Sequence, residues 1–241
     1  MSSKIKGTAL VTGAAKRLGR EVALHLAREG YGIALHYHSS KSEAMATAQA
    51  IYKTGMRCEL FCCDLGDEAE TLKLVPQVFK AFPNLNVLIN SASIFIPNKF
   101  GAVDLGLFKI HWDINFKAPY ILTSEFSRLA QKGQVINFVD TNVVKYKTRY
   151  ADYLMTKKAL LEFTKMAAVQ WGPRIRINGI SPGMILAPVN NQPDDRKKRA
   201  QLIPLQRIGN PRNILQSVQF LLENDFLTGQ IIANDGGEGL I

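Results

Sequence analysis

The stretch Thr12-Gly13-Ala14-Ala15-Lys16-Arg17-Leu18-Gly19 decides the fold, because it joins a short apolar run at residues 8–12 to an amphipathic segment at residues 18–29. Small residues between a strand and a helix let the backbone approach a pyrophosphate, and the start of the helix offers free N–H groups and a partial positive charge. The stretch therefore predicts a phosphate-binding βα turn. Taken alone, it also fits a plain glycine-containing turn.

The same alternation of short apolar runs and helix-length amphipathic segments continues along the chain. Such a pattern predicts parallel strands joined by helical crossovers. We expect strands at residues 8–12, 32–37, 57–63, 87–90, 134–138, 174–180 and 230–233. We expect helices that include residues 18–29, 68–81, 111–130, 153–171 and 211–222. About seven strands and six helices predict one α/β domain over residues 1–241, a Rossmann-type doubly wound parallel sheet with helices on both faces.

The charge balance raises the question of a polyanionic partner. The chain has 30 basic and 20 acidic residues, a net charge of +10, and an ordinary globular content of 46% hydrophobic residues. The basic residues are scattered; the densest group, residues 196–199, lacks the interleaved aromatic residues that are typical of single-strand binding. We therefore expect no nucleic-acid partner, and a phosphate-rich small cofactor explains part of the excess.

Three cysteines and the N-terminal segment bear on the cellular compartment. Cys58, Cys62 and Cys63 lack paired metal-ligand spacing, so we expect reduced thiols and no metal. The first residues lead into an apolar strand without a signal-peptide core, and no apolar run approaches the roughly 18 residues of a membrane span. The expectation is a soluble, cytoplasmic protein without a membrane partner.

The segment after the second predicted strand indicates which dinucleotide would bind. In such folds an acidic residue about 20 positions past the glycines usually binds the adenosine ribose of NAD. Residues 30–42 contain no Asp or Glu, whereas His38, Ser39, Ser40 and Lys41 offer donors and positive charge. This composition favours a 2′-phosphate and hence NADPH. A solvated polar loop is the alternative for each of these residues.

Two further polar turns follow predicted strands. Asp64 and Leu65 follow the third strand, and Asn90-Ser91-Ala92-Ser93 follows the fourth. Ligands bind at the carboxyl ends of strands in such sheets, so adenine and ribose contacts are the expected role. Turn formation or helix capping is the alternative.

Tyr153 and Lys157 are four residues apart in a predicted helix, so they share one face. The ammonium can lower the pKa of the phenol, which then serves as a proton donor that can be recharged, as carbonyl or imine reduction requires. Taken alone, this spacing also fits a surface pair.

Residues 184–207 show no clear periodicity, and a long irregular insert of this kind predicts a substrate lid.

Together these motifs resemble the short-chain dehydrogenase/reductase family over essentially the whole chain. In family order they are Thr12-Gly13 to Gly19, Asp64-Leu65, Asn90-Ser91-Ala92-Ser93, Asn115, Tyr153 with Lys157, Arg176-Ile177-Asn178, Ser181-Pro182-Gly183, and Leu227-Thr228-Gly229 with Asp235-Gly236-Gly237. The resemblance implies that Tyr153, Lys157 and Asn115 are catalytic, with Asn115 supporting a proton-relay water. It also implies cofactor contacts from Gly13, Arg17, Leu18, Gly19, Ser91, Ala92, Pro182, Gly183 and Met184.

Three departures from the common family pattern narrow the resemblance. Arg17 replaces a small residue, Asp140 stands where the family has a serine, and Phe95 follows the Asn90 turn. With His36-Tyr37-His38 as further cofactor residues, the chain resembles the pteridine reductases specifically.

The resemblance implies NADPH-dependent reduction of dihydropterin, and possible action on oxidised pterin or dihydrofolate. The pterin would lie between the nicotinamide and Phe95, with Arg17 and Ser93 as further contacts, while Asp140 handles protons together with Tyr153. The chemistry is consistent, because a flat heterocycle stacks on an aromatic ring and a carboxylate suits the reduction of C=N bonds. Phe95 as a core residue and Asp140 as a helix cap are the alternatives.

Ser39 and Ser91 depart from the pteridine reductase pattern, and Lys41 is expected to supply the missing phosphate charge. Two other functions stay open: a 3-oxoacyl-thioester or other carbonyl reductase, which Asp140 disfavours, and a non-catalytic NADPH-binding regulator, which the intact Tyr153 and Lys157 disfavour. The resemblance also implies a homotetramer formed through the helices around Asn115 and Tyr153. In that assembly, residues 235–241 would reach toward a neighbouring active site.

Overall fold

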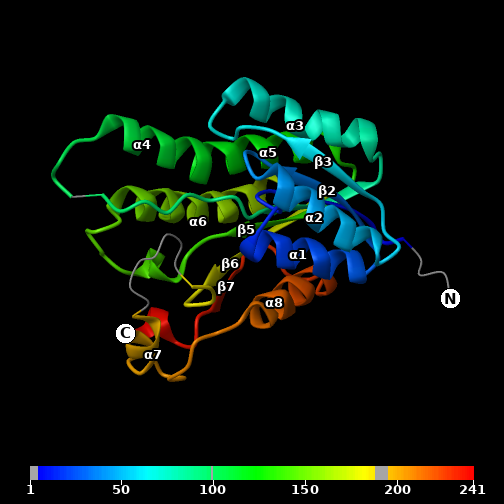
Figure 1. Cartoon of the computed structure of the whole chain (residues 1–241). Helices are drawn as coiled ribbons and strands as arrows, with labels where there is room; N and C mark the ends of the chain where they lie inside the picture. Colours follow the sequence, from blue (N-terminus) through cyan, green and yellow to red (C-terminus); the bar gives the residue numbers. More distant parts are fainter. Residues whose placement is uncertain (1–4, 99, 188–194) are drawn as a thin grey trace.

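Seven parallel strands meet with their carboxyl ends along one edge of a single sheet (Figure 1). The computed structural model describes residues 5–98, 100–187 and 195–241. Its strands are β1 Gly7–Val11, β2 Tyr31–Tyr37, β3 Cys58–Cys62, β4 Leu85–Asn90, β5 Gly133–Phe138, β6 Ile175–Pro182 and β7 Ile231–Asn234. They pair in the order β3-β2-β1-β4-β5-β6-β7. The order reverses between β1 and β4, which is where open sheets of this kind bind ligands.

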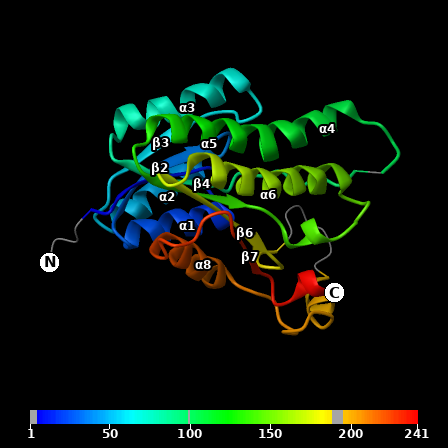
Figure 2. The same ribbon diagram turned by 180° about the vertical axis from the view of Figure 1, so that it is seen from behind.

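Helices cover both faces of the sheet (Figures 1 and 2). One face carries α1 Arg17–Arg28, α2 Lys41–Tyr52 and α8 Pro211–Glu223. The other carries α3 Glu68–Ala81, α5 Ala118–Leu129 and α6 Ala151–Trp171, while α4 Leu105–Trp112 continues the line of α5 and packs against α6. The short helix α7 Arg196–Ala200 lies near the C-terminus. The predicted fold class, a doubly wound Rossmann-type α/β domain, is confirmed.

The central strands are buried on both sides, as expected for a parallel sheet between two helical layers. Every residue of β1 and β2 is buried. A cluster of buried apolar side chains, including Val22, Leu26 and Val218, fills one side of the sheet, and a second cluster around Leu122 and Phe126 fills the other. These two cores make the edge of the sheet a rigid platform for the site.

Two helices differ from the sequence-based expectation. The helix expected at residues 111–130 begins six residues earlier, at Leu105, because Asp104 caps it by accepting a 2.9 Å hydrogen bond from Leu107 N–H. A π turn at Asp113–Lys117 then separates α4 from α5. The helix α2 was not among the predicted segments, since its buried positions, Ala44, Thr47, Ala48 and Ile51, have helical spacing but carry mostly small or polar side chains.

Buried amides fix the register of the sheet near the site. Asn90 and Asn137 are partners in the β4–β5 pair, and Asn90 Nδ2 donates to Asn137 Oδ1 at 2.8 Å. Asn137 Nδ2 in turn donates to Thr164 on α6 at 2.9 Å, and Asn90 Nδ2 also reaches Thr123 on α5 at 3.2 Å. Because buried polar groups are costly when unpaired, this network favours a single arrangement of β4, β5 and the helices behind them.

Candidate active site

The turn between β1 and α1 is shaped to receive a phosphate group. Gly13 has φ +65°, and a Cβ there would lie 3.0 Å from Ala92 Cα. A Cβ on Gly19 would lie 2.4 Å from the Gly13 carbonyl oxygen. No side chain caps α1 at Lys16, and its first turn contains no acidic residue. Its first N–H groups therefore face an open, positively charged position that fits a pyrophosphate.

His36 supports this turn from beneath. Its Nδ1 accepts a 3.0 Å hydrogen bond from Gly13 N–H, and its Nε2 lies 3.0 Å from the Cys63 carbonyl oxygen. Burial lowers the pKa of His36 to about 4, so the ring is neutral at pH 7. Both ring nitrogens are engaged within the protein, so His36 orders the turn instead of contacting a cofactor as expected. Tyr37 is buried as well.

The segment after β2 lies open to solvent at the same edge of the sheet. His38, Ser39 and Lys41 are exposed, and His38 Nε2 lies 3.9 Å from the Asp64 carboxylate at the end of β3. Asp64 Oδ1 also accepts a 2.8 Å hydrogen bond from Gly66 N–H, whereas the Leu65 side chain is buried. The arrangement brings His38 and Asp64 together, and the exposed donors and cation of residues 38–41 are of the kind that binds a 2′-phosphate. Together with the glycine turn, it fits NADPH.

Thr12 joins this cofactor turn to the turn after β4. Its Oγ1 accepts hydrogen bonds from Ser91 N–H at 2.9 Å and Ala92 N–H at 3.0 Å. The same hydroxyl lies 3.3 Å from the Ile89 carbonyl oxygen, to which it donates. In the sequence, Thr12 stood out only as the first residue of the glycine motif. Its position at the end of a buried strand was the available signal for this role.

Asn115 lies in the π turn and holds the segment that follows β4. Its Oδ1 accepts from Ile94 N–H at 2.9 Å and from Ser93 Oγ at 3.0 Å, while its Nδ2 donates to the Ile94 carbonyl oxygen at 3.0 Å. The side chain is fully buried, and both ends of its amide are hydrogen-bonded to residues 93–94. The structure therefore gives Asn115 a positioning role, and the water relay stays a prediction.

Tyr153, Asp140 and Lys157 converge at the ends of β5 and α6. The Tyr153 hydroxyl donates a 2.8 Å hydrogen bond to Asp140 Oδ2, and Asp140 Oδ1 accepts two hydrogen bonds of 2.7 Å from Asn142. Lys157 Nζ donates to the Phe138 carbonyl oxygen at 2.8 Å and lies 5.8 Å from the centre of the Tyr153 ring. Three of the four predicted catalytic residues therefore form one cluster, and the fourth, Asn115, holds residues 93–94.

The charges in this cluster act on Tyr153 in the opposite sense to the expectation. Burial and the adjacent Asp140 carboxylate raise the pKa of Tyr153 well above its ordinary value. Burial lowers the pKa of Lys157 to about 8. Asp140 is hydrogen-bonded directly to the Tyr153 hydroxyl, whereas the Lys157 ammonium is hydrogen-bonded to a main-chain carbonyl. The carboxylate therefore has the larger effect on the pKa of Tyr153. In this structure Tyr153 is a firmly protonated phenol.

Phe95 lies at the mouth of this cluster and not in the core. Its ring is stacked on Tyr150, with centroids 4.2 Å apart, and meets Tyr153 edgewise at 4.7 Å. Its side chain is 57% exposed, although aromatic residues of this size are usually buried. Phe95 therefore offers an exposed aromatic surface beside the Tyr153 ring. The stacking partner, Tyr150, was not identified from the sequence.

Arg17 spans the entrance between the glycine turn and the segment after β6. It begins α1 with φ +55°, a conformation that favours glycine, and its guanidinium donates to the Ala187 carbonyl oxygen at 2.8 Å. The exposed side chain thus links the cofactor turn to the predicted lid. Residues 188–194 of that lid lie outside the described residues.

The segment after β6 packs against the end of β7, at the carboxyl ends of the strands. Gly183 N–H donates to the Asn234 carbonyl oxygen at 3.1 Å, and a Cβ on Gly183 would lie 2.7 Å from Asp235 Cα, so only glycine fits there. Pro182, which ends β6, and Met184 flank this glycine. The three predicted cofactor residues therefore lie beside the end of β7.

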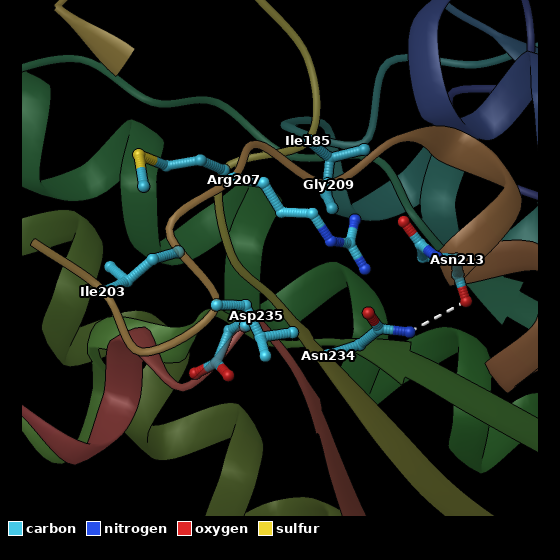
Figure 3. A pocket seen from close by; sticks show the side chains of 10 residues that line it. Ile185, Ile203, Arg207, Gly209, Asn213, Asn234 and Asp235 are labelled. Atoms are coloured by element: carbon cyan, nitrogen blue, oxygen red, sulfur yellow. Dashed lines mark hydrogen bonds between the residues drawn. The ribbon is translucent and has the colours of Figure 1, made fainter. Parts of the chain in front are cut away.

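A small cavity of about 60 Å³ lies behind this segment, lined by Met184, Ile185, Arg207, Asn234 and others (Figure 3). The Arg207 guanidinium points into it toward Asn213, whose carbonyl oxygen accepts a 2.8 Å hydrogen bond from Asn234 Nδ2. The cavity has room for a few water molecules and none for a bicyclic substrate. The candidate reaction site is instead the open face at Tyr153 and Phe95.

Within the described part of the chain, no group of three or more His, Cys, Asp or Glu side chains could hold a metal ion. In the same part, no helix is long and apolar enough to cross a membrane.

The fold and the site together define a nucleotide-dependent oxidoreductase on a Rossmann-type sheet, and comparison with known proteins identifies the family. A family model described as enoyl-(acyl carrier protein) reductase matches residues 13–238. The chain belongs to the short-chain dehydrogenase/reductase family.

Individual relatives and solved structures that the chain is similar to carry different names. The 3-oxoacyl-[acyl-carrier-protein] reductase FabG of Staphylococcus aureus strain Mu50 is 31% identical, over 97% of this chain and 98% of that protein. A crystal structure of FolM alternative dihydrofolate reductase 1 from Brucella suis in complex with NADP is 33% identical, with a TM-score of 0.93, over 98% of this chain and 96% of that chain. A blue fluorescent protein from a metagenomic library, in complex with NADPH, is 29% identical with a TM-score of 0.90, over 97% of this chain and 98% of that chain.

Proposed function

We propose that this protein is an NADPH-dependent pterin reductase that converts dihydropterin to tetrahydropterin. The observation that carries the proposal is the 2.8 Å hydrogen bond between Tyr153 and Asp140, beside the exposed ring of Phe95. A carboxylate paired with a phenol can deliver a proton to a ring nitrogen, and an open aromatic surface suits a flat heterocycle.

NADPH, when bound, supplies the hydride that adds to the ring carbon of the C=N bond. The glycine turn with Arg17 would hold the pyrophosphate. His38, Ser39, Ser40 and Lys41 would surround the 2′-phosphate, and Asp64 the adenosine. Lys157 would donate its remaining N–H groups to the nicotinamide ribose, because only one of them is engaged by Phe138.

A side chain of the protein supplies the proton that the substrate needs in addition to the hydride. The Tyr153 hydroxyl donates its proton to the ring nitrogen of the same C=N bond as the hydride reaches the carbon. Its raised pKa keeps the proton on the phenol until the substrate nitrogen gains electron density. Asp140 is partly open to solvent, so it can take up a proton there and return it to Tyr153 through the existing hydrogen bond. This sequence restores both residues for the next turnover.

The second candidate is a 3-oxoacyl-thioester reductase, which the 31% identity to FabG favours. The likeness to FolM alternative dihydrofolate reductase supports the pterin assignment at a similar identity of 33%. Asp140 separates the two candidates on chemical grounds, since a carboxylate bonded to the tyrosine repels the developing oxyanion of a ketone. Steady-state turnover of a dihydropterin and of an acetoacetyl thioester, each with NADPH and with NADH, tests the choice.

The proposal includes a homotetramer. The layer formed by α4, α5 and α6 exposes apolar side chains, among them Leu105, Phe108, Tyr120, Met166 and Val169. A row of such side chains on adjacent helices is typical of a surface that another subunit covers. Light scattering should then give a mass about four times that of the 26.8 kDa chain.

A further inference from the structure

The segment that follows Asp140 carries three cations that the proposed reaction does not use. Lys145, Lys147 and Arg149 lie within five residues of one another, directly after the 3-10 turn Thr141–Val144. We call these three side chains the cationic lip. Figures 1 and 2 both place this segment on the same side of the molecule as α7 and the C-terminus, beyond the carboxyl ends of β5 and β6.

The cationic lip is fixed to the segment that carries Phe95. Asn98 N–H donates to the Arg149 carbonyl oxygen at 3.0 Å, and Asn98 Oδ1 accepts from Asp152 N–H at 3.3 Å. The Arg149 guanidinium lies 5.5 Å from the centre of the Tyr150 ring, and Tyr150 is stacked on Phe95. The aromatic surface and the cationic lip are therefore parts of one connected wall at the mouth of the site.

The cationic lip carries a local excess of positive charge, although the carboxylates of Glu238 and Asp140 lie near Lys147. None of its three side chains forms an ion pair among the residues that the structure describes, whereas the neighbouring Arg199 is paired with Glu238 at 3.1 Å and with Asp195 at 3.7 Å. Burial and the nearby charges of Lys145 and Arg199 lower the pKa of Lys147, and the charges of Glu238 and Asp140 only partly oppose this shift. A bound anion would relieve this concentration of positive charge.

Resting on the proposed function, we propose that the cationic lip binds the carboxylates of a tail attached to the pterin ring. With the ring beside Phe95 and Tyr153, a tail that leaves the site on this side would have Arg149 near the Tyr150 ring and Lys147 within the influence of Asp140. Arg149 can hold a carboxylate through two parallel hydrogen bonds, and Lys147 can pair with a second one. The substrate class is then a dihydropterin with a polycarboxylate tail, such as a dihydrofolate with several γ-linked glutamates, and not a dihydropterin with a short neutral side chain.

An acidic carrier protein could also bind a positively charged surface, but the size and position of the cationic lip favour a small carboxylate tail. The lip is three side chains on one short segment next to Asp140, and Lys147 is influenced by the Asp140 charge itself. A protein partner would need a much wider complementary surface.

The test compares KM values for three substrates: a dihydropterin without carboxylates, dihydrofolate with one glutamate, and dihydrofolate with several γ-linked glutamates. The enzymes are the wild type, the double variant Lys147→Gln/Arg149→Gln, and the control Lys53→Gln. Lys53 is an exposed lysine at the end of α2, at the opposite edge of the sheet. The readout is the ratio of KM without a tail to KM with the longest tail.

We expect this ratio to be well above one in the wild type and in Lys53→Gln, to fall by roughly three- to tenfold in the double variant, and to fall in the wild type at high salt. A ratio near one in the wild type, or an equal change of all KM values in the double variant, would overturn the tail site while leaving pterin reduction in place. Absence of turnover on every pterin would refute the proposed function and the tail site together. A lip effect seen only with a carrier-protein thioester would assign the lip to an acidic protein.

Discussion

The Tyr153 hydroxyl donates a 2.8 Å hydrogen bond to the Asp140 carboxylate, and this contact sets the acidity of the site. A phenol beside a carboxylate keeps its proton, so Tyr153 is an acid that releases a proton only when a basic atom forms in front of it. The ring nitrogen of a C=N bond that receives hydride is such an atom.

Replacing Asp140 with serine should lower the kcat for a dihydropterin by roughly 100-fold or more, which is the usual contribution of a positioned acid–base group. The change removes the group that recharges Tyr153 and leaves the cofactor turn intact, so the Kd for NADPH should stay within about twofold. Stopped-flow and fluorescence titration measure the two quantities. Unchanged pterin turnover would remove Asp140 from the reaction.

Replacing Phe95 with alanine should raise the KM for the pterin by roughly 10-fold and change NADPH binding little, because a stacking surface contributes on the order of 1 kcal/mol beyond its buried area. Phe100→Ala is the matched control, since Phe100 is 66% exposed and Phe95 is 57% exposed. If Phe95→Ala lowered only the thermal stability, Phe95 would be a packing residue after all.

Arg17→Gly separates the role of this side chain from its backbone. The backbone of residue 17 has φ +55°, and glycine adopts this conformation with less strain, on the order of 1 kcal/mol. The change of backbone should therefore not lower the thermal midpoint of unfolding. Loss of the guanidinium should weaken NADPH binding by roughly 10-fold at low salt, because one phosphate contact is lost. Isothermal titration measures the affinity, and an unaltered Kd would show that Arg17 does not contact the cofactor.

His36 makes stability depend on pH. Its folded-state pKa of about 4 is below its ordinary value of 6.5, so the unfolded chain binds more protons between these pH values. Neutral, buried His36 therefore contributes on the order of 3 kcal/mol to the free energy of unfolding. This contribution is fully present above about pH 6.5 and is lost as the pH falls toward 4. Urea unfolding of the wild type should therefore show a lower free energy at about pH 5 than at about pH 7.5.

His36→Asn is the comparison for this pH dependence. It should be less stable at neutral pH, since the hydrogen bond from Gly13 is altered, and it should lose most of the slope between the two pH values. An equal slope in both proteins would place the pH dependence in other groups.

The positions of the strands along the chain and the cofactor turn could be predicted from the sequence because both depend on local patterns. Apolar runs of strand length mark β1 to β7, and the small residues around Gly13 mark the first crossover. The convergence of Asp140 with Tyr153 was also expected, but from the family resemblance and not from their spacing of thirteen residues.

What the sequence could not reveal depends on contacts between distant segments. His36 was expected at the cofactor, yet its place under Gly13 and against Cys63 follows from how three strands align. The direction of the Tyr153 pKa shift depends on which charge is nearer to the hydroxyl, which the i, i+4 spacing with Lys157 does not specify. The stacking of Tyr150 on Phe95 likewise joins residues 55 positions apart.

The most direct test is steady-state oxidation of NADPH, with NADH in parallel, by the purified protein offered a dihydropterin, dihydrofolate or an acetoacetyl thioester. The proposed function predicts turnover on the pterin substrates with a preference for NADPH, and little or none on the thioester. Turnover on the thioester alone would contradict it: the protein would still be a short-chain dehydrogenase/reductase, but the roles given to Phe95 and Asp140 would be wrong.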